Sequence, residues 1–278
     1  MKAVSQQRNR LQFLRKNYIP IVLVICVLFV GVVVIARSLF AKPTYVYVKI
    51  KVGQGLWWAA TAKPNIWMVN SMKKGDTKDD ALGRTQAKLI SIKKYPTIIN
   101  SQYDVYVTAV IKAGFNKKTG EYSFNRSSLS VGSPIDLQFP KIYLTGTVIG
   151  ISPNPIKDSY VEKKLYLVSQ GGYLKDFPYR YDAIKIGDVY FDGEQKVFEV
   201  IDKQLEKNIW SIGNSLTGTI YEGAVDTTQN IVVIANVKLL KKEDGFYFGE
   251  ENRVNINSYI PFTTSDYYFE SFHIRKIE

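Results

Sequence analysis

Residues 106–112 read YVTAVIK, and residues 232–238, 126 positions further along the chain, read VVIANVK. Both segments alternate apolar and polar residues, which is the period-two pattern of a β-strand with one face in a core. Each is followed by a lysine-rich turn that ends in glycine, at 117–120 and at 241–245. The pair therefore predicts that one β unit occurs twice in this chain.

The repeat extends to both sides of these strands with a nearly constant offset. Gly120-x-Tyr122 matches Gly245-x-Tyr247, each at the expected start of a strand. The other matches are Lys74-Gly75-Asp76 with Ile186-Gly187-Asp188, and 131–135 with 256–260. We therefore expect two small, duplicated β-barrels or sandwiches in tandem, over 44–151 and 161–278. A linker at 152–160 contains two prolines that interrupt strand pairing.

The rest of the sequence after residue 44 also has the signals of strands and turns. Residues 44–52, TYVYVKIKV, alternate β-branched and aromatic residues with polar ones. Further strands are expected at 86–92, 105–112, 121–124, 134–139, 142–151, 165–169, 196–201, 231–240, 245–248 and 267–277. Short helical turns are expected at 64–72 and 158–164. This part of the chain is predicted to be all-β.

An uncharged apolar run at 19–36 precedes the β region. At about 1.5 Å per residue it would cover roughly 27 Å, close to the bilayer's hydrocarbon thickness of about 30 Å. Five basic residues and no acid precede it, which predicts a cytoplasmic N-terminus. Its length, and the absence of an A-x-A cleavage site, favour a signal-anchor over a cleaved signal peptide. The sequence predicts a cytoplasmic tail at 1–17, a single-pass transmembrane helix at 18–38, and an extracytoplasmic β ectodomain.

The net charge of +12 is unevenly distributed. Residues 1–42 contribute +7 and the other 236 residues only +5, so we expect no nucleic-acid partner, while an anionic wall polymer stays open. The only cysteine, Cys26, lies in the apolar run, which leaves the β region without a disulfide or thiolate metal site. The only histidine, His273, argues against a zinc site and a histidine triad. We expect no metal and no cofactor.

Two short patterns resemble catalytic motifs. Ser71-Met72 followed by Gly75-Asp76 resembles the nucleophile box of type I signal peptidases, which use a Ser-Lys dyad. The expected Pro-Thr pair is replaced by Lys74-Gly75, and no strand that could supply the base is found. Ser71-x-x-Lys74 and the Lys-Thr-Gly at 118–120 match penicillin-binding proteins but lie only 47 residues apart. We assign no catalytic residue.

Two clusters were weighed as ligand sites. The loop at 75–83 holds three aspartates, but its lysines and the missing closing glutamate favour an exposed turn over a calcium site. Trp57, Trp58 and Trp67 follow the first strand. Packing in the core is expected for these tryptophans, with contact to a membrane interface or to a sugar as the alternatives.

The arrangement of an N-terminal anchor before Lys74-Gly75-Asp76, 132–135 and Gly146-Thr147-Val148 resembles an uncharacterised bacterial family. Its members are short, membrane-anchored, β-rich proteins, and the resemblance brings no catalytic residue. The same Gly-Asp-plus-strand pattern occurs in periplasmic adaptor proteins of export systems, which also carry long helical hairpins. We expect a non-enzymatic, membrane-anchored scaffold or adaptor of the cell envelope that presents β domains to a protein partner. The alternatives are an export-system adaptor, a wall-glycan-binding module and a Ser-Lys peptidase.

Overall fold

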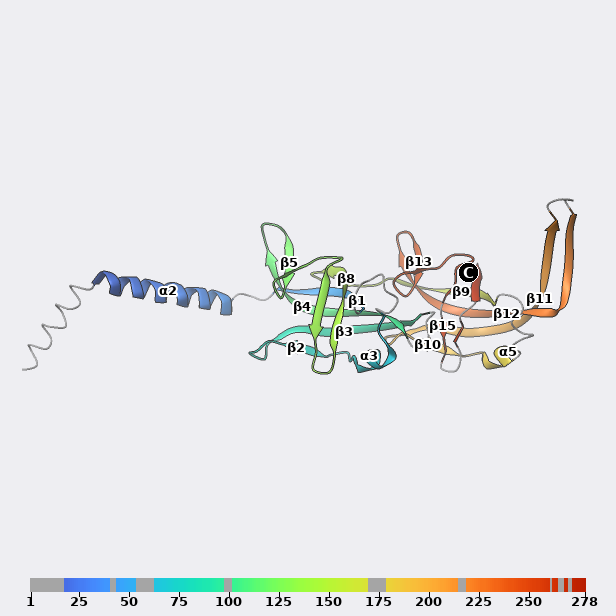
Figure 1. Ribbon diagram of the computed structural model, residues 1–278, viewed down its shortest axis with the longest axis horizontal. Coiled ribbons are helices and arrows are strands. Elements are labelled where there is room, and N and C mark those ends of the chain that lie inside the picture. Colours follow the sequence, from blue (N-terminus) through green and yellow to red (C-terminus); the bar gives the residue numbers. More distant parts are fainter. Residues whose placement is uncertain are drawn as a thin grey trace, which may run out of the picture. The chain divides into compact units, whose positions relative to one another are not determined.

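A computed structural model describes residues 18–40, 44–53, 63–97, 102–169, 179–214, 219–260, 262–264, 268–269 and 272–278. The chain divides into two compact units, Met1–Thr44 and Tyr45–Glu278. The first unit contains helix α2 (Tyr18–Phe40). The second contains two large antiparallel sheets, with the short helices α3 (Ile66–Ser71) and α5 (Tyr179–Ala183) (Figure 1).

Helix α2 corrects the expectation of a membrane span. Among the described residues, no helix is long and apolar enough to cross a membrane, so the predicted signal-anchor and transmembrane helix at 18–38 were wrong. The predicted extracytoplasmic location of the rest of the chain stays a prediction.

The first large sheet is built from residues up to 152. Its strands are β1 (Thr44–Val52), β2 (Thr77–Asp79), β3 (Thr85–Pro96), β4 (Tyr103–Asn116), β5 (Glu121–Phe124), β6 (Ser127–Leu129), β7 (Pro134–Gln138) and β8 (Tyr143–Ser152). They lie in the order β2-β3-β4-β1-β8-β7, and β5 and β6 continue from β4. The alternation in β4 buries Val107, Ala109 and Ile111 completely, in a core that also contains Met68 and Val69 of α3.

The second large sheet follows the same plan. Its strands are β9 (Tyr160–Ser169), β10 (Val189–Phe191), β11 (Lys196–Asn214), β12 (Thr219–Lys242), β13 (Gly245–Phe248), β14 (Asn252–Arg253) and β17 (Phe272–Ile277). A separate two-stranded sheet joins β15 (Phe262–Thr263) and β16 (Tyr268–Phe269). The neighbours run β10-β11-β12-β9-β17, which matches β2-β3-β4-β1-β8. Val233, Ala235 and Val237 of β12 are fully buried, like their counterparts in β4.

The helical turn expected at 158–164 does not form. Strand β9 begins at Tyr160 and pairs with β12, Leu240 opposite Tyr160 and Val237 opposite Lys163. The apolar residues of β9 alternate, so Leu165 and Leu167 are fully buried on the core side. Period-two burial against β12 therefore decides the conformation of this segment.

One turn geometry occurs four times in the second unit, twice with each sheet. The four copies occupy 73–76, 130–133, 185–188 and 255–258. In each copy the third residue has a positive φ, and it is glycine in three copies and Asn257 in the fourth. Its N–H donates to the carbonyl of a strand residue whose own N–H donates to the carbonyl of the fourth turn residue. These strand residues are Leu89, Val148, Val200 and Ile274.

A β-bulge follows each of these four strand residues. In the pairing of β3 with β4 the register shifts between Leu89 and Ser91, and in the pairing of β11 with β12 it shifts between Val200 and Asp202. The same shift follows Val148 in β8 and Ile274 in β17. A bulge bends its strand and increases the twist, so the four bulges curve both sheets in the same way. The repeated unit thus consists of a turn, a strand residue that forms two backbone hydrogen bonds with that turn, and a bulge.

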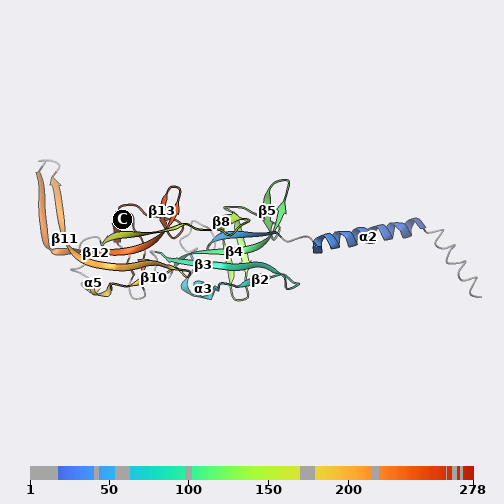
Figure 2. The same ribbon diagram turned by 180° about the vertical axis from the view of Figure 1, so that it is seen from behind.

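The two halves differ most in one hairpin. In the β3–β4 hairpin, paired residues Leu89 and Ala109 lie 20 positions apart, while their counterparts in β11–β12, Val200 and Ala235, lie 35 apart. The paired backbone of β11 and β12 continues to Asn214 and Thr219. These two strands extend beyond the rest of the second sheet as an arm (Figures 1 and 2).

Candidate functional site: the junction of the two halves

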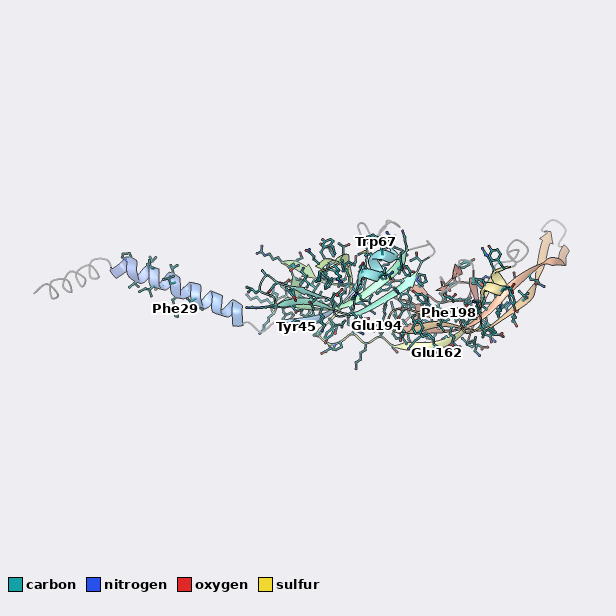
Figure 3. The ribbon with its side chains drawn as sticks, turned by 90° about the horizontal axis from the view of Figure 1, so that it is seen from below. Phe29, Tyr45, Trp67, Glu162, Glu194 and Phe198 are labelled. Atoms are coloured by element: carbon teal, nitrogen blue, oxygen red, sulfur yellow. The ribbon has the colours of Figure 1, made fainter. Side chains whose placement is uncertain are left out.

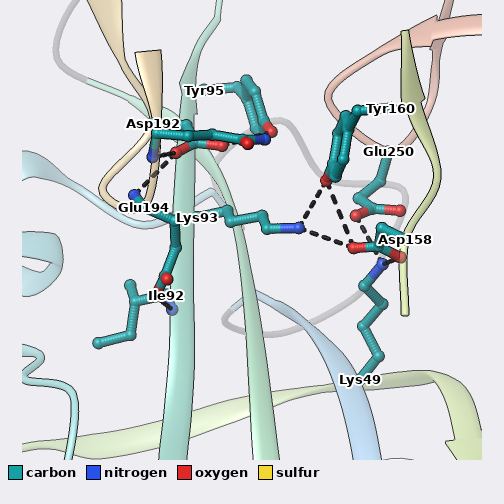
Figure 4. Close-up of polar contacts among 10 residues, drawn as sticks. Lys49, Ile92, Lys93, Tyr95, Asp158, Tyr160, Asp192, Glu194 and Glu250 are labelled. Atoms are coloured by element: carbon teal, nitrogen blue, oxygen red, sulfur yellow. Dashed lines mark hydrogen bonds and ion pairs between the residues drawn. The ribbon is translucent and has the colours of Figure 1, made fainter. Parts of the chain in front are cut away.

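A cluster of buried and half-buried polar groups lies where the first half (45–152) meets the second half (153–278). It contains Lys49 of β1, Lys93 and Tyr95 of β3, and acidic residues of the second half (Figure 4). The core-facing side chains of β1 are Val46, Val48, Ile50 and Val52. Lys49 lies on the opposite face of the strand, where its ammonium pairs with acids of the second half. Figure 3 shows the described side chains and labels Glu194 of the second half among them.

Asp158 is the centre of this cluster. Its Oδ1 accepts a hydrogen bond from Lys49 Nζ and its Oδ2 accepts one from Lys93 Nζ, both at 2.7 Å. Lys93 Nζ also donates to the Tyr160 hydroxyl at 2.6 Å, and that hydroxyl donates to Asp158 Oδ2 at 3.3 Å. The aromatic ring of Tyr160 lies 4.9 Å from the same ammonium. One carboxylate therefore ties two strands of the first half to the start of β9.

A second carboxylate completes the charge balance. Glu250, which is buried in the loop between β13 and β14, forms an ion pair with Lys49 at 2.7 Å. Its backbone carbonyl accepts a hydrogen bond from Lys242 Nζ at 2.7 Å, and the neighbouring Glu251 pairs with Lys51. Two lysines thus face two carboxylates, and none of the four side chains is more than 16% exposed, so each charge that is largely removed from water has a counter-charge.

The turn at 192–195 docks on the edge of β3. The Lys94 N–H donates to the Asp192 carbonyl at 2.7 Å, and Tyr190 Oη donates to the Lys94 carbonyl at 3.0 Å. Gly193 has a φ of +108°, and a Cβ at this position would lie 2.7 Å from the Ile92 carbonyl oxygen. Glu194 then reaches Lys74 Nζ at 3.1 Å. The second half therefore covers an otherwise open sheet edge of the first half.

Tyr95 carries the apolar part of the junction. Its ring belongs to the hydrophobic core of the second half, where it packs edge-on against Phe248 at 5.5 Å between ring centroids. Tyr106 of β4 joins the same core and lies 6.2 Å from Tyr95. The Tyr95 hydroxyl donates to Asp192 Oδ2 at 3.0 Å, while Asp192 Oδ1 accepts the N–H groups of its own turn. The end of the β3–β4 hairpin is therefore built into the second half.

The junction changes the acidity of its groups. Burial tends to raise the pKa of Asp158, but the hydrogen bonds from Lys49 and Lys93 outweigh it, so this pKa lies below its ordinary value. Burial, together with the charge of Asp192, raises the pKa of Tyr95 far above its ordinary value. Burial and the charge of Asp158 also raise the pKa of Tyr160. The carboxylate is held charged and the two tyrosines neutral, as an ion-pair network requires.

The Ser-Lys pattern does not form a dyad. The Ser71 hydroxyl donates to the Trp67 backbone carbonyl at 2.8 Å, one turn earlier in α3. The Lys74 ammonium faces Glu194 of the second half. The Lys-Thr-Gly at 118–120 lies in the turn between β4 and β5, where Lys118 N–H donates to Asn116 Oδ1. These motifs are explained by turn and junction contacts.

Two of the three aspartates of the 75–83 loop, Asp76 and Asp80, accept hydrogen bonds within its turns. Asp76 accepts the Lys73 N–H, and Asp80 accepts the N–H groups of Leu82 and Arg84. No group of three or more metal-ligating side chains occurs among the described residues.

The aromatic residues and the histidine are only partly placed. Trp67 is 66% exposed on α3, so the expectation of core packing was wrong for this side chain. Trp57 and Trp58 lie outside the described residues. His273 lies in β17, where burial lowers its pKa, and its ring packs edge-on near Tyr259.

Sequence reasoning did not find the junction residues. Lys49 and Asp158 are 109 positions apart, and Lys93 and Asp158 are 65 apart, so no local spacing connects them. Residues 44–52 alternate without interruption, with Val46, Val48, Ile50 and Val52 buried, so Lys49 and Lys51 share the opposite face of the strand. No local pattern marks Lys49 as a residue that the second half covers.

Comparisons with protein families, with characterised proteins and with solved structures find no match to this chain.

Proposed function

We propose that this chain is a non-catalytic scaffold or adaptor that presents two joined β modules to a protein partner. The observation that carries the proposal is the junction itself. Its buried lysines, carboxylates and tyrosines contact one another across the two halves, and they tie the two sheets into one compact unit. A fixed spacing between two modules lets a partner engage both without the entropic cost of ordering them.

The geometry also supports the proposal over the peptidase alternative. A Ser-Lys dyad needs the serine hydroxyl within about 3 Å of a lysine amine. Here Ser71 and Lys74 each contact a different group, the Trp67 carbonyl and the Glu194 carboxylate. Ser71 therefore bonds within helix α3, and Lys74 belongs to the junction.

In-cell photo-crosslinking tests this function. A photoreactive amino acid is placed at Trp67 in the first half or at Phe191 in the second, both more than half exposed. The matched control position is Phe248, which is fully buried. We expect the same protein to be captured from both exposed positions and not from the control. If no protein is captured from either exposed position, the proposal is contradicted. If the chain has a peptidase activity that Ser71→Ala abolishes, the peptidase alternative takes the place of the scaffold proposal.

A further inference from the structure

The two halves carry opposite net charges. Residues 45–152 contain 15 lysines and arginines against 6 aspartates and glutamates, a net +9, while 153–278 contain 15 against 19, a net −4. The ion pairs at the junction follow this difference in charge. Among the described residues, every ion pair between the halves joins a lysine of the first half to an acid of the second. The contact between the two halves is therefore one in which the first half supplies the basic side chains and the second half supplies the acidic ones.

The internal repeat shows which residues would make the next contact of this kind. Lys74 occupies the second position of the turn at 73–76, and Ile186 occupies the same position at 185–188. Glu194 and Leu82 correspond as well, because each donates its N–H to the aspartate two residues earlier. Lys74 and Glu194 pair with each other, whereas Ile186 and Leu82 are 61% and 71% exposed. The counterparts of an ion pair are thus two uncovered apolar side chains.

The hairpins show the same relation. The β3–β4 hairpin ends in the second half, where Tyr95 and Tyr106 enter its core. Its counterpart, β11–β12, runs in the same direction and is the arm that extends beyond the second half (Figures 1 and 2). The β2–β3 turn that carries Leu82 lies at the end of the first half away from the junction (Figure 1). The β11–β12 arm at one end of the unit is thus a second copy of the β3–β4 hairpin. The β2–β3 turn at the other end is a second copy of the turn at 192–195 that contacts this hairpin.

We propose that a second copy of this chain continues the junction head to tail. The turn at 80–84 of one copy docks beside Ile186 and the β11–β12 arm of its neighbour, as the turn at 192–195 docks beside Lys74 and β3 within one chain. The basic first half then faces the acidic second half of the next copy, which favours association and sets its direction. Because the two contacting surfaces differ, the contact can add copies beyond a dimer, in a ring or in an open chain.

This inference deepens the scaffold function, because it names a second copy as one partner. It is tested by sedimentation velocity of the purified full chain over a range of concentrations. We expect concentration-dependent association of the wild-type chain that weakens with added salt. Leu82→Glu and Ile186→Lys should each weaken it about tenfold or more, since each places a charge in an apolar contact. The matched control is Val131→Glu, an equally exposed residue at the same turn position outside the proposed contact.

Mixing Leu82→Glu with a third variant, Ile186→Glu, separates a head-to-tail contact from other modes. Each of these variants keeps one intact end and their altered ends are both acidic, so an equimolar mixture should form dimers and no longer species. The double variant L82E/I186K recreates the Lys74–Glu194 pair and should associate again. A wild-type chain that stays monomeric, variants that associate like Val131→Glu, or a mixture that forms no dimer would each overturn the inference. Such a result would leave capture of a different protein in cells unchanged, so the two failures are distinguishable.

Discussion

Asp158→Asn should destabilise the second unit because it removes the carboxylate that two lysines share. The side chains of Lys49, Lys93 and Asp158 are only 10%, 12% and 16% exposed. Asparagine keeps the shape of aspartate but cannot compensate the charge on Lys93, whose only other polar contact among the described residues is the Tyr160 hydroxyl. Lys49 keeps Glu250 as a partner. The substitution therefore leaves one buried lysine without its counter-charge.

The magnitude follows from the burial of the pair. Removing one partner of a fully buried ion pair costs about 3–5 kcal/mol. Since these side chains keep some contact with water, we expect the lower end, about 3 kcal/mol. For a unit of this size each kcal/mol shifts Tm by about 2–4 °C, so Tm should fall by about 6–12 °C.

The assay is urea unfolding followed by circular dichroism, with the free energy of unfolding obtained by linear extrapolation. The control is Asp136→Asn, which changes an exposed aspartate of β7 and should cost less than about 0.5 kcal/mol. If Asp158→Asn falls within about 0.5 kcal/mol of this control, the lysines are not held by Asp158 and the reasoning about the junction is wrong. A Lys93→Met variant completes a double-mutant cycle. The loss of unfolding free energy in the double variant with Asp158→Asn should be smaller than the sum of the losses in the two single variants.

The other predictions concern pH, a glycine and an aromatic ring. Because the folded state lowers the pKa of Asp158, its contribution is complete above the ordinary carboxyl pKa of about 3.9 and is lost as the pH falls through the lower folded value. The difference in unfolding free energy between wild type and Asp158→Asn should therefore shrink below about pH 4, and a difference that stays constant down to pH 2 would refute this assignment. Gly193→Ala should destabilise the second unit by about 2 kcal/mol or more, because the new Cβ would clash with the Ile92 carbonyl and the residue keeps a positive φ. Gly75→Ala has open space around it and adds only the strain of a positive φ. Unfolding curves of equal midpoint for the two variants would contradict this. Tyr95→Ala should cost about 3–5 kcal/mol as a large-to-small change in a core, and Trp67→Ala, an exposed ring, much less, measured by thermal unfolding of both variants.

Local pattern was sufficient for the strands and for the turns. The alternation at 105–112 and 231–240 predicts one buried face, because side chains in a strand point to opposite sides with period two. The three turn glycines could be found because their positive φ is a local requirement that few other residues meet. The segment at 158–164 was mistaken for a helix, since a short polar stretch lacks a clear period until β12 pairs with it.

The sequence by itself determined that this chain is β-rich, that its unit is repeated and where its turns lie, because each of these depends on residues within a few positions of one another. Only the tertiary structure decided that Lys49, Lys93, Asp158 and Glu250 form one network, because their contact requires two sheets from distant segments to dock in one particular arrangement. The same holds for the exposure of Leu82 and Ile186. Coulomb attraction depends on distance in space, and distance in space is fixed by packing between residues that are far apart along the chain.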